Sequence, residues 1–189
     1  MSPAKSRLGW KDHAKSWFAD AERVEAELWR GVEAQHKVST MPLVDSTYEQ
    51  GLLEEMLEQS KPPLPAAARK LHYLIGAPFR YASRWPSRFR TQAEPGVWYG
   101  AHRLETAAAE VAYWRWRFVR DSDAFQARPV LTEHTFYRAQ VGGRAVDLSL
   151  APWDAWRTAW MDPDDYSACQ ALARQARDAG IEWVRYSSV

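Results

Sequence analysis

Apolar residues recur three or four positions apart near the start of the chain, at Trp17, Ala21, Val24 and Leu28. In a helix, this spacing brings side chains to one face. Many of the surrounding residues are good helix formers. The sequence therefore predicts a first amphipathic helix over residues 10–33.

Ser46 and Glu49 mark the start of a second predicted helix. They have the spacing of a capping box, in which the serine side chain accepts a hydrogen bond from the backbone N–H of the glutamate. An apolar stripe follows, made of Leu52, Leu53, Met56 and Leu57. Proline interrupts a helix, so this one is expected to end before Pro62, Pro63 and Pro65.

The pattern changes over residues 77–101, where aromatic and arginine residues are interrupted by prolines and a glycine. Such a segment predicts short strands and loops, and residues 97–101 form the best strand. Residues 104–118 are rich in alanine and glutamate and predict a helix.

The last third of the chain predicts a hairpin followed by a helix and a strand. Residues 132–140 and 145–148 are the expected hairpin strands, with Gly142 and Gly143 as their turn. The helix is expected to start at Asp162 and Pro163 and to stop at Gly180, and residues 181–186 predict the strand. This order of elements favours an α+β fold over a regular βαβ repeat.

Composition limits the classes of function. The 189 residues carry 25 Lys and Arg against 24 Asp and Glu, so no overall charge attracts nucleic acid or anionic lipid. No apolar run is long enough to span a membrane, and residues 1–10 lack a signal-peptide core, so a cytoplasmic location and no membrane partner are expected. The single cysteine, Cys169, lies in an apolar setting that predicts burial.

Eleven tryptophans are many for this length, and they cluster at Trp114 and Trp116 and again at Trp153, Trp156 and Trp160. Core packing is one interpretation of these clusters. A surface for a protein partner is the other, because tryptophan is enriched at interface hot spots.

Four segments together resemble the RES family, which is named for its Arg, Glu and Ser residues. They are Pro-Phe-Arg-Tyr at 78–81, Ser-Arg-Phe at 87–89, Val-Trp-Tyr-Gly at 97–100 leading through Thr106 to Ala-Glu-Val at 109–111, and Tyr-Ser-Ala-Cys-Gln-Ala-Leu-Ala at 166–173. Arg88 and Tyr99 are eleven residues apart (88 to 99), and so are Tyr99 and Glu110 (99 to 110), which is similar to the family's spacing.

The resemblance implies a single mixed domain akin to the ADP-ribosyltransferase fold. It divides the chain into an N-terminal helical leader, residues 1–70, packed on a RES domain, residues 71–189. Members of the family usually continue past the final strand, so the C-terminal strand region is expected to be cut short here. The resemblance also implies NAD as substrate and a toxin paired with an Xre-type antitoxin, through which alone the toxin would meet nucleic acid. The family's reactions split NAD with phosphate or water, or transfer ADP-ribose to a protein acceptor.

The site that the resemblance implies consists of two overlapping sets. The catalytic set is Arg80, Tyr99, Glu110 and Ser167, and the NAD-binding set is Arg80, Tyr81, Arg88, Tyr99, Ser187 and Ser188. Cleavage of the bond between nicotinamide and ribose passes through an oxocarbenium-like state, which a carboxylate can stabilise while arginines bind the diphosphate. Ser167 opens a helix whose N-terminal N–H groups favour an anion.

Several alternatives stay open at this stage. Arg30 competes with Arg80 as the first family arginine, Glu105 competes with Glu110 as the glutamate, and Ser187 or Ser188 competes with Ser167 as the serine. Arg84 is a further candidate for anion binding, but an ion pair with a surface carboxylate is the preferred interpretation. The five histidines lack the spacing of metal ligands, and the glycine motifs of dinucleotide folds are absent, so no metal and no Rossmann-type binding of NAD are expected.

A non-enzymatic module that binds nucleic acid or protein is the remaining alternative. It is suggested by arginines interleaved with aromatic residues: Arg84, Arg88, Arg90, Arg115, Arg117 and Arg120. The balanced net charge argues against it.

Overall fold

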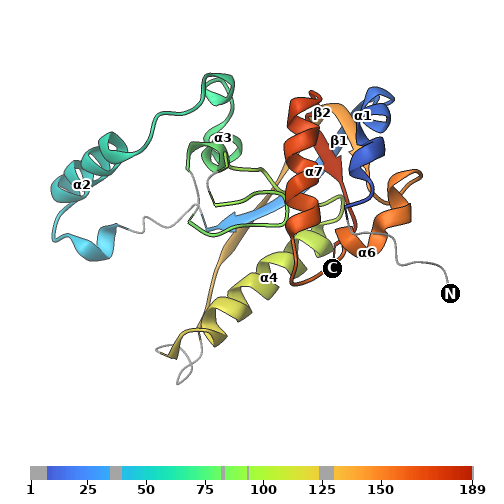
Figure 1. Ribbon diagram of the computed structural model, residues 1–189. Coiled ribbons are helices and arrows are strands. Elements are labelled where there is room, and N and C mark those ends of the chain that lie inside the picture. Colours follow the sequence, from blue (N-terminus) through green and yellow to red (C-terminus); the bar gives the residue numbers. More distant parts are fainter. Residues whose placement is uncertain (1–7, 35–39, 82–83, 93, 124–129, 189) are drawn as a thin grey trace. The chain divides into compact units, whose positions relative to one another are not determined.

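The computed structural model describes residues 8–34, 40–81, 84–92, 94–123 and 130–188 (Figure 1). Its helices are α1 (Lys11–Ala19), α2 (Thr47–Ser60), α3 (Tyr73–Arg80), α4 (Leu104–Arg120), α6 (Arg157–Trp160) and α7 (Ser167–Asp178). Its strands are β1 (Arg23–Glu33), β2 (His134–Asp147) and β3 (Trp183–Arg185), and short 3-10 turns lie at Met41–Leu43, Ala66–Ala68 and Trp153–Trp156. The chain therefore has a mixed α/β fold, in agreement with the α+β class that the order of elements predicts.

The three strands form one sheet in the order β1-β2-β3. Strand β1 runs antiparallel to β2, because the N–H of Ala34 donates to the oxygen of Glu133 and the N–H of Ala145 donates to the oxygen of Glu22. Strand β3 runs parallel to β2, with Ala145 opposite Trp183. Antiparallel and parallel pairing are thus combined in one small sheet.

The predicted helix over residues 10–33 is wrong in its second half. Helix α1 ends at Ala19, and residues 23–33 form β1. The backbone of Trp29 exchanges two hydrogen bonds with Ala101, of 2.7 and 2.8 Å. This pairing with a distant segment overrides a local pattern that fits a helix, and Gly31 weakens the helical alternative further.

The predicted hairpin at Gly142 and Gly143 is also wrong, because β2 is continuous through both glycines. Gly143 has a φ of +154°, and a Cβ there would come within 2.6 Å of Oε2 of Glu182. That same oxygen accepts a hydrogen bond of 2.8 Å from the N–H of Arg144. The glycine therefore allows a close approach of Glu182 to the strand, not a chain reversal.

The helix boundaries show where local signals suffice. The capping box is confirmed, since Oγ of Ser46 accepts a hydrogen bond from the N–H of Glu49, and the helix ends at Ser60, before the prolines. Helix α4 covers the predicted residues 104–118 and continues to Arg120. None of the helices in the described segments is both long and apolar enough to cross a membrane.

Four other predictions differ from the structure in their boundaries. Helix α7 starts at Ser167 and not at Asp162, whose carboxylate instead accepts hydrogen bonds from two backbone N–H groups of the preceding turn. Its stop is confirmed, with Gly180 at a φ of +71°. Residues 77–80 belong to α3, and the strand expected at 97–101 is reduced to the bridge between Ala101 and Trp29. The strand expected at 181–186 is β3, three residues long.

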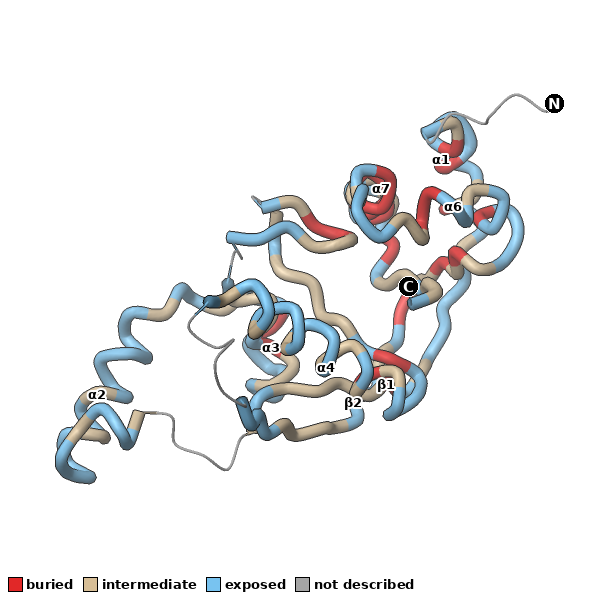
Figure 2. Tube along the Cα trace, turned by 90° about the horizontal axis from the view of Figure 1, so that it is seen from below, coloured by how far each residue is buried: buried red, intermediate tan, exposed pale blue. Residues whose placement is uncertain are grey.

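The chain divides into two compact units, and the division passes through β1 and β2. The first unit comprises residues 1–27, 81–98 and 140–189, and the second comprises residues 28–80 and 99–139. The first unit contains α1, α6 and α7, and α7 supplies much of its buried surface (Figure 2). Residues 1–70, the leader that was expected to be helical, also contain a strand, β1.

Tryptophans fill the core of the first unit. The rings of Trp10 and Trp160 lie 5.4 Å apart, and those of Trp17 and Trp153 lie 4.9 Å apart. Cys169 is buried beside them, as predicted. Core packing is therefore correct for Trp153 and Trp160, whereas Trp114 and Trp116 are exposed on α4.

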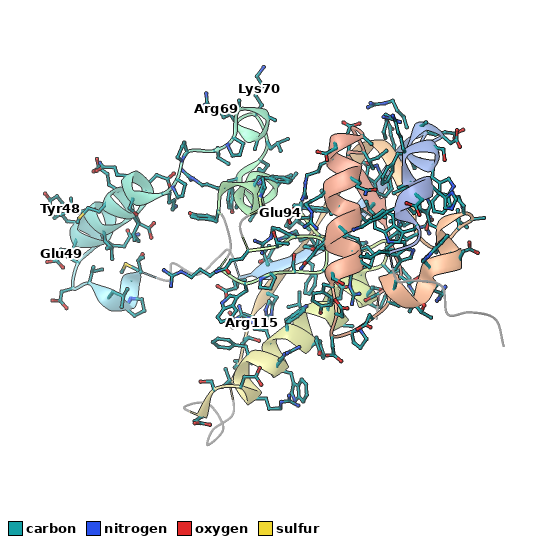
Figure 3. The ribbon with its side chains drawn as sticks, viewed as in Figure 1. Tyr48, Glu49, Arg69, Lys70, Glu94 and Arg115 are labelled. Carbon is teal, nitrogen blue, oxygen red and sulfur yellow. The ribbon has the colours of Figure 1, made fainter. Side chains whose placement is uncertain are left out.

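Glu94 ties the loop before Val97 to α7 within the first unit (Figure 3). One carboxylate oxygen accepts from the N–H of Thr91 over 2.6 Å, and the other lies 2.9 Å from Nη2 of Arg177 and 3.5 Å from Nη1 of Arg174. Partial burial raises the pKa of Glu94, but the hydrogen bonds from Thr91 and the two guanidinium charges outweigh it, so the pKa lies below its ordinary value.

A lowered pKa means that the ionised carboxylate stabilises the folded state above the pKa of the unfolded chain and stops doing so as pH falls through the folded pKa. We expect Glu94→Gln to lower the free energy of unfolding by about 1–2 kcal/mol at pH 7. Urea unfolding of both proteins at several pH values checks this. The difference should shrink toward zero in acid, and a difference that is constant with pH would contradict the role of the charge.

Candidate functional site

Arg30 and Tyr99 are in direct contact in the second unit. Arg30 lies on β1, and its Nη1 donates a hydrogen bond of 2.8 Å to the backbone oxygen of Tyr99. The pairing of Trp29 with Ala101 brings the two segments together. Burial lowers the pKa of Arg30 and the nearby Tyr137 raises it, but a guanidinium remains charged in any case. A largely buried positive charge therefore fixes the backbone position of Tyr99.

Helix α4 lies directly against β1 at Gly31. A Cβ on Gly31 would come within 2.6 Å of Phe136 and 2.7 Å of Val111. Further along both elements, Arg115 of α4 forms an ion pair with Glu33 of β1 (Figure 3). Two strand residues rise about 6.6 Å and four helix residues rise about 6 Å, so α4 and β1 run side by side in the same direction.

Glu110 lies at the margin of this contact. Ala107 is buried and Val111 meets Gly31, so these two residues, one turn apart, define the covered face of α4. Glu110 directly precedes Val111 and is half-buried. Arg30 and Tyr99 are thus in contact, and Glu110 lies next to the residue of α4 that meets Gly31. Because neighbouring strand residues point to opposite faces, the side chain of Arg30 leaves β1 on the face away from α4.

The close contact at Gly31 predicts a specific sensitivity. Gly31→Ala should lower the free energy of unfolding by about 1–3 kcal/mol, because the added methyl group overpacks the contact with Phe136 and Val111. Gly51→Ala is the matched control, since a Cβ on this residue of α2 meets nothing within 4 Å and alanine is the better helix former. Thermal unfolding compares them: a Gly31→Ala variant as stable as the parent would contradict this packing.

The alternative acid, Glu105, is in a different setting. It lies in the first turn of α4, with a largely exposed side chain 3.4 Å from Arg103. An exposed pair of this kind has little effect on its surroundings. This observation favours Glu110 over Glu105.

Arg80, the arginine that the sequence favours, binds to the segment after α2. Its Nε donates to the backbone oxygen of Pro62 over 2.6 Å, and its Nη1 lies 2.9 Å from Oε1 of Glu58. Hydrogen bonds from Lys61 and then from Arg80 lower the pKa of Glu58. These contacts of Arg80 hold α3 to α2 and the segment after it, away from Tyr99 and Glu110.

A second group of predicted residues gathers in the first unit, at the start of α7. Nη1 of Arg88 donates to the backbone oxygens of Trp160 and Asp162, over 2.7 and 3.0 Å. Its guanidinium carbon also lies 4.8 Å from the ring centre of Tyr166. Ser167 follows as the exposed first residue of α7. Arg88 and Ser167 are thus linked through Tyr166, a residue that the sequence analysis did not single out although it directly precedes Ser167.

The other predicted residues lie at the ends of elements. Tyr81 follows α3 and is exposed, and so is Arg84. Ser187 and Ser188 follow β3, next to Tyr186, whose ring packs 4.8 Å from that of Phe89. In the segments that the structure describes, no three His, Cys, Asp or Glu residues are grouped so that they could hold a metal ion.

These features define a mixed α/β domain with arginine, tyrosine, glutamate and serine residues at its candidate site. A scan against family models matches residues 63–189 to the RES domain, which is more than half of the chain. The chain belongs to the RES domain family. RES domains occur in the toxins of toxin–antitoxin systems and are generally associated with NAD-related enzymatic toxins. A search of curated proteins gives no match.

Proposed function

We propose that this protein is a toxin that consumes NAD by cleaving the bond between nicotinamide and ribose, and that Arg30, Tyr99 and Glu110 carry the reaction. The observation that supports this most is the hydrogen bond from Arg30 to Tyr99, in a chain of the RES family. Fold similarity to the ADP-ribosyltransferases and regulation by an Xre-type antitoxin are part of the same proposal.

In this scheme, Glu110 supplies the ionised carboxylate of the site. As nicotinamide leaves, positive charge develops on the ribose, and a carboxylate facing that charge stabilises the transition state more than the ground state. Glu110 also accepts hydrogen bonds from ribose hydroxyls. Glu110 is half-buried, so its side chain is still partly accessible to solvent.

Tyr99 orients the nicotinamide ring by stacking, and Arg30 holds Tyr99. A positioned backbone matters because a misplacement of about 1 Å can cost about 100-fold in rate. The buried charge of Arg30 also favours a substrate with an anionic diphosphate. For this reason we assign to Arg30 the role that the sequence analysis gives to Arg80. Arg88, Tyr81, Ser167, Ser187 and Ser188 remain predictions for contacts to NAD.

Three covalent outcomes are compatible with this chemistry. Water adds to C1″ of the nicotinamide ribose, releases a proton and gives ADP-ribose, or phosphate adds there, releases a proton and gives ADP-ribose 1″-phosphate. In both, the C–N bond breaks and its electron pair leaves with nicotinamide. Transfer of ADP-ribose to a protein is the third outcome, with a side chain of the acceptor as nucleophile.

Product analysis tests the proposal. Purified protein is incubated with NAD in the presence and absence of phosphate, and nicotinamide and the ADP-ribose product are followed by proton and phosphorus NMR. Release of nicotinamide supports the proposal, and the product identifies the acceptor. Adenine-labelled NAD added with a bacterial lysate shows whether the label moves to protein. Intact NAD in all three mixtures would overturn the proposal.

A further inference from the structure

Helix α2 has no buried residue over its fourteen positions, Thr47–Ser60 (Figure 2). It contains Glu49, Glu54, Glu55 and Glu58 and no lysine or arginine. Its apolar stripe is largely exposed, including Leu52 at 48% and Met56 at 60%. A helix of this length is marginally stable by itself in water, so an uncovered apolar stripe indicates a surface that docks on something else.

The C-terminal half of α4 has the complementary surface. Four large aromatic side chains there are each at least half exposed: Tyr113, Trp114, Trp116 and Phe118. Arginines border them, with Arg117 lying 5.7 Å from the ring centre of Trp114 and Arg120 lying 4.6 Å from that of Trp116. Both arginines also lie near the carboxylate of Asp121, at 3.7 and 3.8 Å. Two guanidinium groups share this one carboxylate, so the exposed face, which we call the aromatic face of α4, is apolar and keeps a net positive charge.

We propose that α2 of one copy of this chain docks on the aromatic face of α4 of a second copy. The two surfaces match in kind, because an apolar stripe meets aromatic rings, and in charge, because glutamates meet arginines. Glu54 and Glu55 lie on the two sides of the stripe formed by Leu52, Leu53, Met56 and Leu57, as Arg117 and Arg120 border the rings of α4. Packing of one amphipathic helix on another needs no further element.

Length also fits this pairing. The fourteen residues of α2 extend about 21 Å, and the part of α4 from residue 113 to residue 120 extends about 12 Å. In a two-fold symmetric dimer, each chain gives one α2 and receives the other, so every contact occurs twice and the buried area doubles. All of α2 precedes the residues matched to the RES domain, so the leader supplies the acidic partner.

Reversing the charges tests the pairing. One variant carries Glu54→Lys and Glu55→Lys in α2, and another carries Arg117→Glu and Arg120→Glu in α4. Light scattering measures the mass of each over a range of protein concentrations. We expect the parent chain to reach twice its 21.8 kDa mass and each variant to remain monomeric. An equimolar mixture of the two variants should recover the dimer, because lysines then face glutamates in one contact and the second contact is unchanged.

A control has the same change in charge at another surface. Arg69 and Lys70 are exposed in the second unit (Figure 3), and Arg69→Glu with Lys70→Glu should leave the dimer intact. Circular dichroism verifies that every variant is folded. A parent chain that is monomeric at all concentrations would overturn the proposal, and so would a dimer that neither variant weakens, or variants whose mixture stays monomeric. This test does not depend on NAD cleavage, so either proposal can fail without the other.

Discussion

Glu110→Gln is expected to lower kcat for nicotinamide release by about 100- to 1,000-fold, because it removes the negative charge that faces the developing oxocarbenium ion. Glutamine keeps the shape of the side chain, and Glu110 is only half-buried, so stability should change little. KM for NAD should change much less than kcat, because the lost interaction is strongest in the transition state. Steady-state kinetics on purified protein, with a thermal unfolding curve for each variant, measure all three quantities.

Glu105→Gln is the matched control on the same helix. Its carboxylate is exposed and pairs with Arg103, so the variant should retain the parent rate within about twofold. If Glu105→Gln loses the activity and Glu110→Gln keeps it, the catalytic carboxylate has been assigned to the wrong turn of α4. If both variants release nicotinamide as fast as the parent, neither carboxylate takes part.

Arg30→Met should lower kcat/KM for NAD by about 10- to 100-fold, because Tyr99 loses the donor that fixes its backbone and the site loses a positive charge. Methionine keeps much of the length of the side chain and avoids burying a new unpaired donor. Arg80→Met is the comparison, since it removes the contacts to Glu58 and Pro62 and none to Tyr99.

The two arginine variants separate the sequence-based assignment from the structure-based one. A large loss for Arg30→Met and a small one for Arg80→Met support Arg30. The reverse result would restore Arg80, and equal losses would mean that both act. Far-ultraviolet circular dichroism at the assay temperature confirms that the comparison is made between folded proteins.

Local signals were enough to predict some elements and not others. The capping box at Ser46 depends on residues three apart, and Gly180 ends α7 through its own backbone conformation, so both could be predicted from the sequence. Strand β1 could not. Its pattern fits a helix, and its pairing with β2 and with Ala101, both far along the chain, makes it a strand.

The candidate site shows the same limit. Tyr99 and Glu110 are predictions that the resemblance to the RES family implies, but the choice between Arg30 and Arg80 depends on which arginine reaches Tyr99. Arg30 reaches Tyr99 because residues 23–33 form the strand β1, whereas the sequence pattern predicts a helix there. Gly142 and Gly143 are a similar case, because a glycine pair signals a turn locally but here accommodates the side chain of Glu182. Tyr166 was missed because its contact with Arg88 links distant segments.

The central claim is that the region around Gly31, with Arg30, Tyr99 and Glu110, binds the nicotinamide end of NAD. The most direct measurement is an NMR titration of the parent protein with a non-cleavable NAD analogue that has a carbocycle in place of the nicotinamide ribose. The backbone amide resonances of Gly31, Tyr99 and Glu110 should shift with one shared saturation curve. If they stay in place while the analogue saturates the protein, or if no resonance responds at all, the claim is wrong.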